Sequence, residues 1–162
     1  VLEVMANGSL NYTVKGICIG MKVTWNYTPP TNGGDTFTSI KKGSKATLKI
    51  VQDEKNGFVK ELYIQKEPDI DNRTFEAQLQ KTVEQLQITY PFLSVKNKKN
   101  GTYLIDIPQE KRLGHEEHFS KVAKAFLHYV HNQDMPEWEN ENTLAKYYIT
   151  TTAVEMAKKG NK

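Results

Sequence analysis

The sequence has one cysteine, Cys18, among 162 residues, and this excludes an internal disulfide. No segment approaches the roughly 20 consecutive apolar residues of a membrane-spanning helix, and no signal peptide is visible. Neither sign of charge dominates, because 22 Lys and Arg stand against 19 Asp and Glu, for a net charge of +3. We therefore expect no membrane span, and no basic face of the kind that binds nucleic acid.

The familiar nucleotide and catalytic motifs are also missing. The stretch GICIG at residues 16–20 lies inside a strand pattern and lacks the third glycine of a dinucleotide loop. There is no Walker loop, no G-x-S-x-G and no Cys-x-x-Cys. The chain by itself therefore shows no place for a dinucleotide cofactor.

What is present is the composition of one globular domain covering residues 1–162. Hydrophobic residues make up 38% and charged residues 25% of the chain, whose mass is 18.5 kDa. A domain of this length buries enough surface to fold without a disulfide or a metal. The first residues, VLEV, already alternate like a strand and carry no initiator Met, so we interpret the chain as part of a longer protein.

Alternating apolar and polar residues predict an antiparallel sheet in the first part of the chain. The expected strands are residues 2–5, 10–14, 17–27, 36–41, 46–52 and 58–65. The pair Asn7-Gly8 favours a hairpin turn before the second of them. In residues 17–27, the alternate side chains from Ile17 to Trp25 form an apolar face that we expect to be buried, with Cys18 as a small buried filler.

From Asp71 the apolar residues recur every three or four positions, which predicts a helix that ends at Pro91. Asp71, Asn72 and Thr74 offer side-chain oxygens to cap its start. Residues 92–95 and 102–107 then predict another hairpin around Asn100-Gly101.

Residues 114–160 predict two closing helices joined by a turn at residues 132–136, and we expect the rest of the chain to depend on them for packing. The first carries an apolar stripe through Phe119, Val122 and Phe126. The second is apolar on more than one side, which is typical of a sandwiched helix or an interface. The predicted fold class is α+β, an open, mostly antiparallel β-sheet with about three helices packed on one face.

The stretch HEEH at residues 115–118 is the first candidate site. A zincin helix needs histidines at i and i+4, whereas these stand at i and i+3 without a third ligand nearby, so we predict no metal. Glu116 and Glu117 suit the first turn of a helix, where the macrodipole favours carboxylates. His115 could border the core, or it could point into a cleft shared with another domain and transfer protons there.

Asp35 is the second candidate, because it follows Gly33-Gly34 on a loop opened by two prolines. Its carboxylate could bind sugar hydroxyls, or it could cap a turn. Two alternative functions stay open: a non-catalytic carbohydrate- or protein-binding module using Trp25, Tyr27 and the loop before Asp35, and a hydrolase using His115 and Glu116.

Several motifs in order resemble the C-terminal domain of the glucose–fructose oxidoreductase / inositol dehydrogenase (Gfo/Idh/MocA) family, nearest to a bacterial branch of putative oxidoreductases. They are VTWNY at 23–27, GGDT at 33–36, GSKATL at 43–48, GHEEHF at 114–119, PEWE at 136–139 and TLAKYYITTT at 143–152. The resemblance spans nearly the whole chain.

That resemblance implies a two-domain parent with an N-terminal Rossmann domain that holds NAD(P), followed by a sheet that bounds the substrate site and often pairs between subunits. This chain would be the later, substrate-side part, with a sugar or polyol as substrate and no catalysis on its own. The family's cofactor fingerprint and catalytic residues have no match here. Asp35, Thr36 and His115 lie in matched motifs and are the candidate substrate-binding residues, whereas the compartment stays open.

Overall fold

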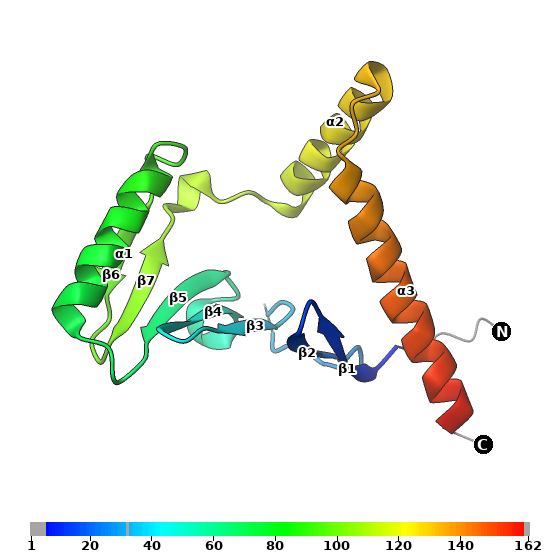
Figure 1. Cartoon of the computed structure of the whole chain (residues 1–162), viewed down its shortest axis with the longest axis horizontal. Helices are drawn as coiled ribbons and strands as arrows, with labels where there is room; N and C mark the ends of the chain where they lie inside the picture. The colour runs from blue at the N-terminus through cyan, green and yellow to red at the C-terminus, as the bar shows by residue number, and fades with distance from the viewer. Residues whose placement is uncertain (1–5, 32, 161–162) are drawn as a thin grey trace. The chain divides into compact units, whose positions relative to one another are not determined.

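The computed structural model describes residues 6–31 and 33–160, and these residues form two compact units (Figure 1). Unit 1 combines the described residues of 1–28 with those of 115–162, and unit 2 is residues 29–114. The predicted strand at residues 2–5 and residue 32 of the predicted loop lie outside the described residues.

Unit 2 is an open five-stranded antiparallel sheet with one α-helix. The strands are β3 (Phe37–Lys42), β4 (Ala46–Gln52), β5 (Glu61–Lys66), β6 (Ser94–Asn97) and β7 (Thr102–Asp106), in the order β3-β4-β5-β7-β6. Helix α1 (Asn72–Gln87) connects β5 to β6, and two short 3₁₀ turns, η1 (Glu54–Asn56) and η2 (Gln109–Lys111), lie in connections. The predicted strands 36–41, 46–52, 58–65, 92–95 and 102–107 are confirmed within a few residues at their ends.

The start of α1 is fixed by Asp71, as the sequence predicts. Its carboxylate accepts hydrogen bonds from the backbone N–H and the hydroxyl of Thr74, each at 2.8 Å. These two hydrogen bonds lower the pKa of Asp71 below its ordinary value, and the bond from the backbone N–H of Thr74 has the larger effect. The N-terminal orphan amides of the helix are thereby partly satisfied.

The described core lies where α1 packs on one face of this sheet. Val83 of α1, Leu93 and Ile105 of β7 are buried together, and Leu62, Ile64, Leu79, Phe92, Val95 and Ile107 pack against them. Tyr103, on the same face, is 3% exposed and donates its hydroxyl to Glu76 of α1 at 2.8 Å. Burial raises the pKa of the Tyr103 hydroxyl, and the bond to Glu76 adds to this.

Unit 1 contains a two-stranded hairpin of β1 (Gly8–Val14) and β2 (Ile17–Val23). Its turn is Lys15-Gly16, where both residues have positive φ (48° and 79°), as a type I′ turn requires. The turn predicted at Asn7-Gly8 is wrong, because Gly8 begins β1. Asn7 instead accepts a hydrogen bond from the backbone N–H of Trp25 through its side-chain oxygen.

The buried face predicted for this hairpin is also wrong. Cys18 is exposed, Ile17 is 66% exposed and Trp25 is 75% exposed. A two-stranded ribbon has too little apolar surface of its own to bury either face, and alternation in the sequence cannot show what covers it.

The two closing helices are α2 (His115–Asn132) and α3 (Glu137–Gly160), so the turn at residues 132–136 is confirmed. Neither helix contains a buried residue, and the packing of the rest of the chain against them stays a prediction. The stripe residues Phe119, Val122 and Phe126 are each more than 60% exposed. The buried core of the described residues lies instead in unit 2.

The fold class is confirmed as α+β, and the described residues form three α-helices and open antiparallel sheets. The strands expected in one sheet fall into two, and the helices divide between the units, α1 with the five-stranded sheet and α2 and α3 with the hairpin. Within the described ranges, no helix is long and apolar enough to cross a membrane.

Candidate functional site

The face of the five-stranded sheet opposite α1 is the first candidate surface, and we call it the open face. Because side chains alternate along a strand, it carries Glu61 and Tyr63 of β5, Leu104 and Asp106 of β7, and Lys96 of β6. The Tyr63 hydroxyl donates to the Glu61 carboxylate at 2.5 Å, and Lys96 pairs with Asp106 at 2.6 Å.

An apolar residue lies between these two polar pairs. Leu104 is only 5% exposed although no α-helix of unit 2 covers its face, and its register partners are Tyr63 and Lys96. Paired residues of neighbouring strands share a face and lie side by side. The open face therefore carries hydrogen-bonding groups around a shielded apolar centre, a composition suited to a polar ligand or a second protein surface.

Tyr63 gives this face a measurable signature. The hydrogen bond to Glu61, with help from burial and from the charges of Glu61 and Asp53, raises the pKa of Tyr63 to about 12. The pKa of Tyr63 in the folded protein lies above the ordinary value of 10.0. The contribution of the Tyr63 hydroxyl to the stability of the fold is therefore fully present below pH 10, and it is lost as the pH rises from 10 to about 12. When the ultraviolet titration curve of the Tyr63→Phe variant is subtracted from that of the wild type, the difference should show one phenol that ionises near pH 12.

The control for this titration is Glu61→Gln, which keeps the shape of the partner and removes its charge. We expect the pKa of Tyr63 to move back toward its ordinary range in that variant, because the hydrogen bond to the Glu61 carboxylate is the largest cause of the shift. A Tyr63 phenol that ionises near pH 10 in the wild type would contradict the arrangement.

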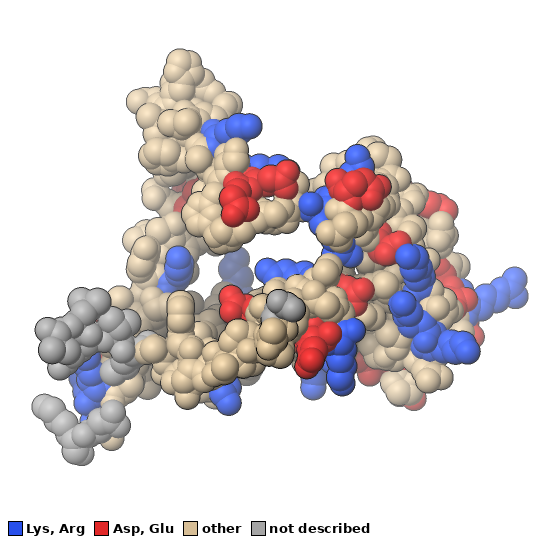
Figure 2. Space-filling view, turned by 180° about the vertical axis from the view of Figure 1, so that it is seen from behind, with Lys and Arg blue, Asp and Glu red and all other residues tan. Residues whose placement is uncertain are grey.

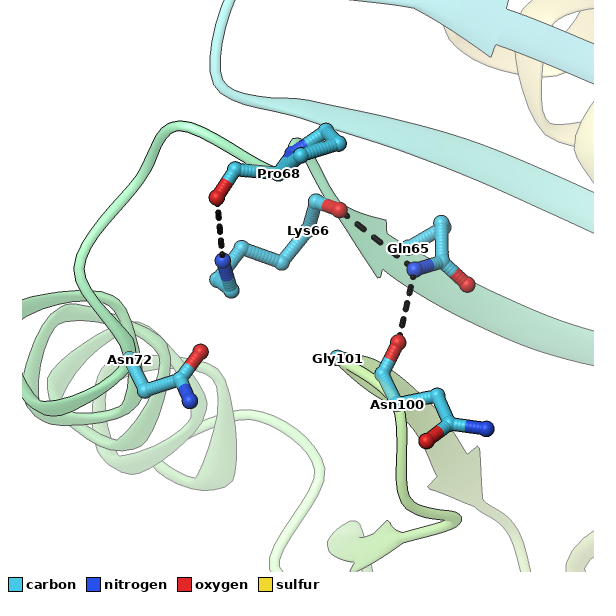
Figure 3. Close-up of a pocket in the computed structure, with 6 residues that line it drawn as sticks. All are labelled: Gln65, Lys66, Pro68, Asn72, Asn100 and Gly101. Carbon is cyan, nitrogen blue, oxygen red and sulfur yellow. Dashed lines mark hydrogen bonds between the residues drawn. The ribbon is translucent and has the colours of Figure 1, made fainter.

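A shallow polar pocket of about 440 Å³ lies at the end of the same sheet (Figure 3). Its lining residues are Gln65, Lys66, Pro68, Asn72, Asn100 and Gly101. Gln65 bridges its walls, since its amide nitrogen donates to the Asn100 carbonyl at 3.1 Å and its amide oxygen accepts from the Thr102 hydroxyl. Asn72, in the first turn of α1, directs its amide toward the pocket (Figure 3).

Lys66 is the cation of this pocket, yet it is 8% exposed and is used within the fold. Its ammonium donates to the backbone carbonyls of Glu67, Pro68 and Ile70. An ammonium has three donors, and these carbonyls account for all of them. Lys66 therefore holds the loop that leads into α1, and it has no donor left for an anion in the pocket.

Asp35 and Thr36 lie together just before β3, and both are exposed. The backbone carbonyl of Asp35 accepts a hydrogen bond from the Gln52 amide at 2.9 Å, which fixes the segment beside the end of β4. The turn before it closes through the Gly33 N–H and the Pro30 carbonyl at 2.7 Å, and a Cβ on Gly33 would come within 2.8 Å of Pro30. The glycine is therefore required there, and the Asp35 carboxylate is presented to solvent.

His115 is the first residue of α2 and is exposed, in unit 1 rather than in unit 2. Its ring meets Phe119 edge-on, with centroids 4.9 Å apart. His128 lies near the other end of α2, where it pairs with Asp134 at 3.1 Å. In the part of the chain that the structure describes, no three His, Cys, Asp or Glu side chains gather as a metal site would need.

Charged residues of both signs are interspersed on unit 2, with no large area of one sign on the face shown in Figure 2. The slight net charge of +3 is thus spread out. This distribution gives no electrostatic footprint for nucleic acid on that face.

The open-face pairs and the polar pocket were not found by sequence reasoning. Glu61 and Tyr63 stand two apart in an ordinary strand pattern, and Asn100-Gly101 by itself predicts only a turn. The alternation in β5 could have placed Glu61 and Tyr63 on one side, but no local signal pairs Lys96 with Asp106 across two strands.

Comparisons with known proteins give two matches. The family model described as "Putative oxidoreductase C terminal domain" matches residues 1–158. A crystal structure of a putative oxidoreductase from Parabacteroides merdae ATCC 43184 is similar to this chain with a TM-score of 0.90 and 39% sequence identity. The similarity covers 95% of this chain and 35% of that one, so this chain spans about a third of the length of the solved relative. No curated protein matches.

Proposed function

This chain belongs to the family of putative oxidoreductase C-terminal domains, and from that premise we propose that it is the substrate-side and assembly domain of an NAD(P)-dependent sugar or polyol oxidoreductase. The observation that carries the proposal is the match over residues 1–158, to a domain that in the solved relative is about a third of a longer chain. The catalytic part of such a protein would lie in the remaining two thirds.

The nucleotide does not fit the residues of this chain. Dinucleotides usually bind at the carboxyl ends of parallel strands, where a glycine-rich turn leads into a helix. Every strand pair in the described residues is antiparallel, and the sequence has no such turn. We therefore assign NAD(P) to the preceding domain.

The substrate role rests on the surfaces of unit 2. The open face offers a carboxylate, a phenol and an ion pair around Leu104, and Asp35 and Thr36 present further oxygens before the edge strand β3. Sugars and polyols carry many hydroxyls, which groups of this kind can orient by hydrogen bonds. We also keep His115 as a candidate in this role. Pairing of two copies through the open face is the form of assembly we propose.

The test is a fluorescence titration with NADH and NADPH of the full-length protein and of the 162-residue chain. We expect micromolar binding by the full-length protein and none by the chain alone, because the cofactor contacts lie in the preceding domain. Reduction of NAD⁺ or NADP⁺ with a panel of polyols and aldoses, followed at 340 nm, then identifies the substrate class.

Two results would contradict the proposal. Micromolar binding of either nucleotide by the 162-residue chain alone would mean that the cofactor site lies in this domain and not in the preceding one. A full-length protein that binds neither nucleotide would remove the oxidoreductase assignment itself. As a control, the full-length protein is refolded in the presence of each nucleotide. This distinguishes a protein that never binds the cofactor from one that has lost its affinity during purification.

A further inference from the structure

The polar pocket of unit 2 offers a ligand no charged group that is free to bind it. Besides Pro68, its lining side chains are the carboxamides of Gln65, Asn72 and Asn100 and the ammonium of Lys66. That ammonium gives its three donors to backbone carbonyls, and no carboxylate is among the lining residues. The pocket therefore lacks a charged partner for an anion or a cation, whereas it can exchange hydrogen bonds with a neutral polar molecule.

The walls of the pocket are held in place by the fold itself. The Gln65 amide nitrogen donates to the Asn100 carbonyl at 3.1 Å, and the backbone N–H of Lys66 donates to the Gly101 carbonyl at 2.8 Å. These bonds tie the end of β5 to the turn between β6 and β7, and the Lys66 ammonium holds the loop before α1. A ligand would therefore lose little binding free energy to ordering the site.

The turn between β6 and β7 has an unusual backbone where it meets the pocket. Lys99, Asn100 and Gly101 have φ angles of 73°, 50° and 71°. Lysine is uncommon in this left-handed region, and the fold has to supply the free energy that such a conformation costs. A Cβ on Gly101 would lie 3.5 Å from the Gln65 amide and from the Lys66 side chain. The glycine therefore keeps this wall free of a side chain.

Asn72 is the side chain that is best placed to meet a ligand. Its carboxamide is directed toward the pocket (Figure 3), and no residue that the structure describes forms a hydrogen bond with it. The start of α1 does not depend on it, because the N-cap is Asp71. A carboxamide both donates and accepts hydrogen bonds, as a hydroxyl does, so it can pair with two neighbouring hydroxyls of one molecule.

We propose that this pocket binds a neutral polyhydroxyl compound, a sugar or polyol, at a second site separate from Asp35. Its volume of about 440 Å³ lies in the usual range of small-molecule pockets. A nucleobase would need a stacking surface, and Pro68 supplies the only ring of the lining. A peptide strand would need an unpaired main chain, but that of Lys66 is already paired with Gly101.

The second site lies at the opposite end of the sheet from Asp35. Strand β5 runs from Glu61 to Lys66, and the pocket is at its Lys66 end. Asp35 is held by Gln52, the last residue of β4, which lies near the Glu61 end in the register of the two strands. At about 3.3 Å per residue, the two ends are roughly 16 Å apart. The inference goes beyond the proposed function, because binding here needs neither a nucleotide nor turnover.

The experiment is an NMR titration of the full-length protein labelled with ¹⁵N-glycine. The amide of Gly101 reports on the pocket, and the amide of Gly34 reports on the segment that contains Asp35. The neutral probes are myo-inositol, D-glucose and xylitol, and the charged probe is inorganic phosphate. We expect the Gly101 signal to shift saturably with a neutral probe, with a Kd on the order of 1 mM because the pocket is shallow. Phosphate should bind there at least about tenfold more weakly, since Lys66 has no donor to offer it.

The variant Asn72→Ala tests the proposed contact directly. Loss of its carboxamide should raise the Kd of the neutral probe, measured at Gly101, about tenfold. Helix α1 should keep its start, because the cap at Asp71 remains and alanine favours a helix. The matched control is Gln85→Ala, which removes an exposed carboxamide near the other end of α1 and should leave the Kd unchanged.

Three outcomes would overturn the proposal. The first is a Gly101 signal that does not shift saturably with any neutral probe. The second is tighter binding of phosphate, which would make the pocket an anion site. The third is an unchanged Kd in Asn72→Ala, which would mean that the probe lies elsewhere. The Gly34 signal and the nucleotide titration report on the proposed function in the same sample, so its failure is distinguished from failure of the second site.

Discussion

The substitution Val83→Asp should abolish the cooperative folding of unit 2, both in the full-length protein and in the 162-residue chain alone. Val83 is 2% exposed and is the residue through which α1 joins Leu93 and Ile105 in the core. A carboxylate there would lose its hydration and gain no partner, which costs more than about 4 kcal/mol. Few other buried residues support this unit, so hydrogen exchange of the amides in β5 and β7 should lose its protection.

The control on the same helix is Gln85→Asp, which adds the same charge at an exposed position. It should change the free energy of unfolding by less than about 1 kcal/mol. Val83→Ala, which leaves a small cavity, should cost about 1–3 kcal/mol and keeps the comparison measurable if Val83→Asp does not fold. Equal protection in Val83→Asp and Gln85→Asp would show that the core lies elsewhere.

The second large effect is expected from Lys66→Met. The methionine keeps much of the aliphatic stem but leaves the carbonyls of Glu67, Pro68 and Ile70 without their shared donor. Hydrogen bonds from a charged donor contribute about 1.5–3 kcal/mol, so we expect a loss of about 2–3 kcal/mol in the free energy of unfolding. Urea denaturation followed by circular dichroism measures it.

Lys49→Met is the matched control, since Lys49 is an exposed lysine of the neighbouring strand β4. It should leave the stability within about 0.5 kcal/mol of the wild type. If Lys66→Met and Lys49→Met are equally stable, water replaces the ammonium in the loop, and Lys66 is then free of a structural role.

Helix α1 shows what the sequence could predict. Its cap at Asp71 is local, because the acceptor and the Thr74 donors stand three residues apart, and its apolar spacing identifies the face that meets the sheet. The strands of unit 2 follow in the same way from alternation and turn residues. These features depend on neighbours in the sequence, which is why they were predicted correctly.

Helices α2 and α3 and the first hairpin show what it could not. Periodicity identifies the apolar side of an element but not the body that covers it, so the predicted burial of Cys18 is wrong, whereas the two closing helices themselves are confirmed. The turn at Lys15-Gly16 was missed because lysine is an uncommon residue at positive φ.

The candidate site divides along the same line. Asp35, Thr36 and His115 were selected from local motifs, and their role in binding stays a prediction. The Tyr63–Glu61 pair and the Lys66 loop depend on strand register and on contacts between β5 and the start of α1. Sequence periodicity does not contain that register.

The position of β3 at the margin of the sheet has a consequence for self-association. Its main chain offers unpaired amides and carbonyls on one side, and a second molecule could in principle extend the sheet there. The strand ends in the exposed Lys41-Lys42, and lysines on an edge strand are a common means by which natural sheets discourage such pairing. Copies of this chain are therefore discouraged from joining edge to edge into fibres, and broad surfaces are left as the route by which they can meet.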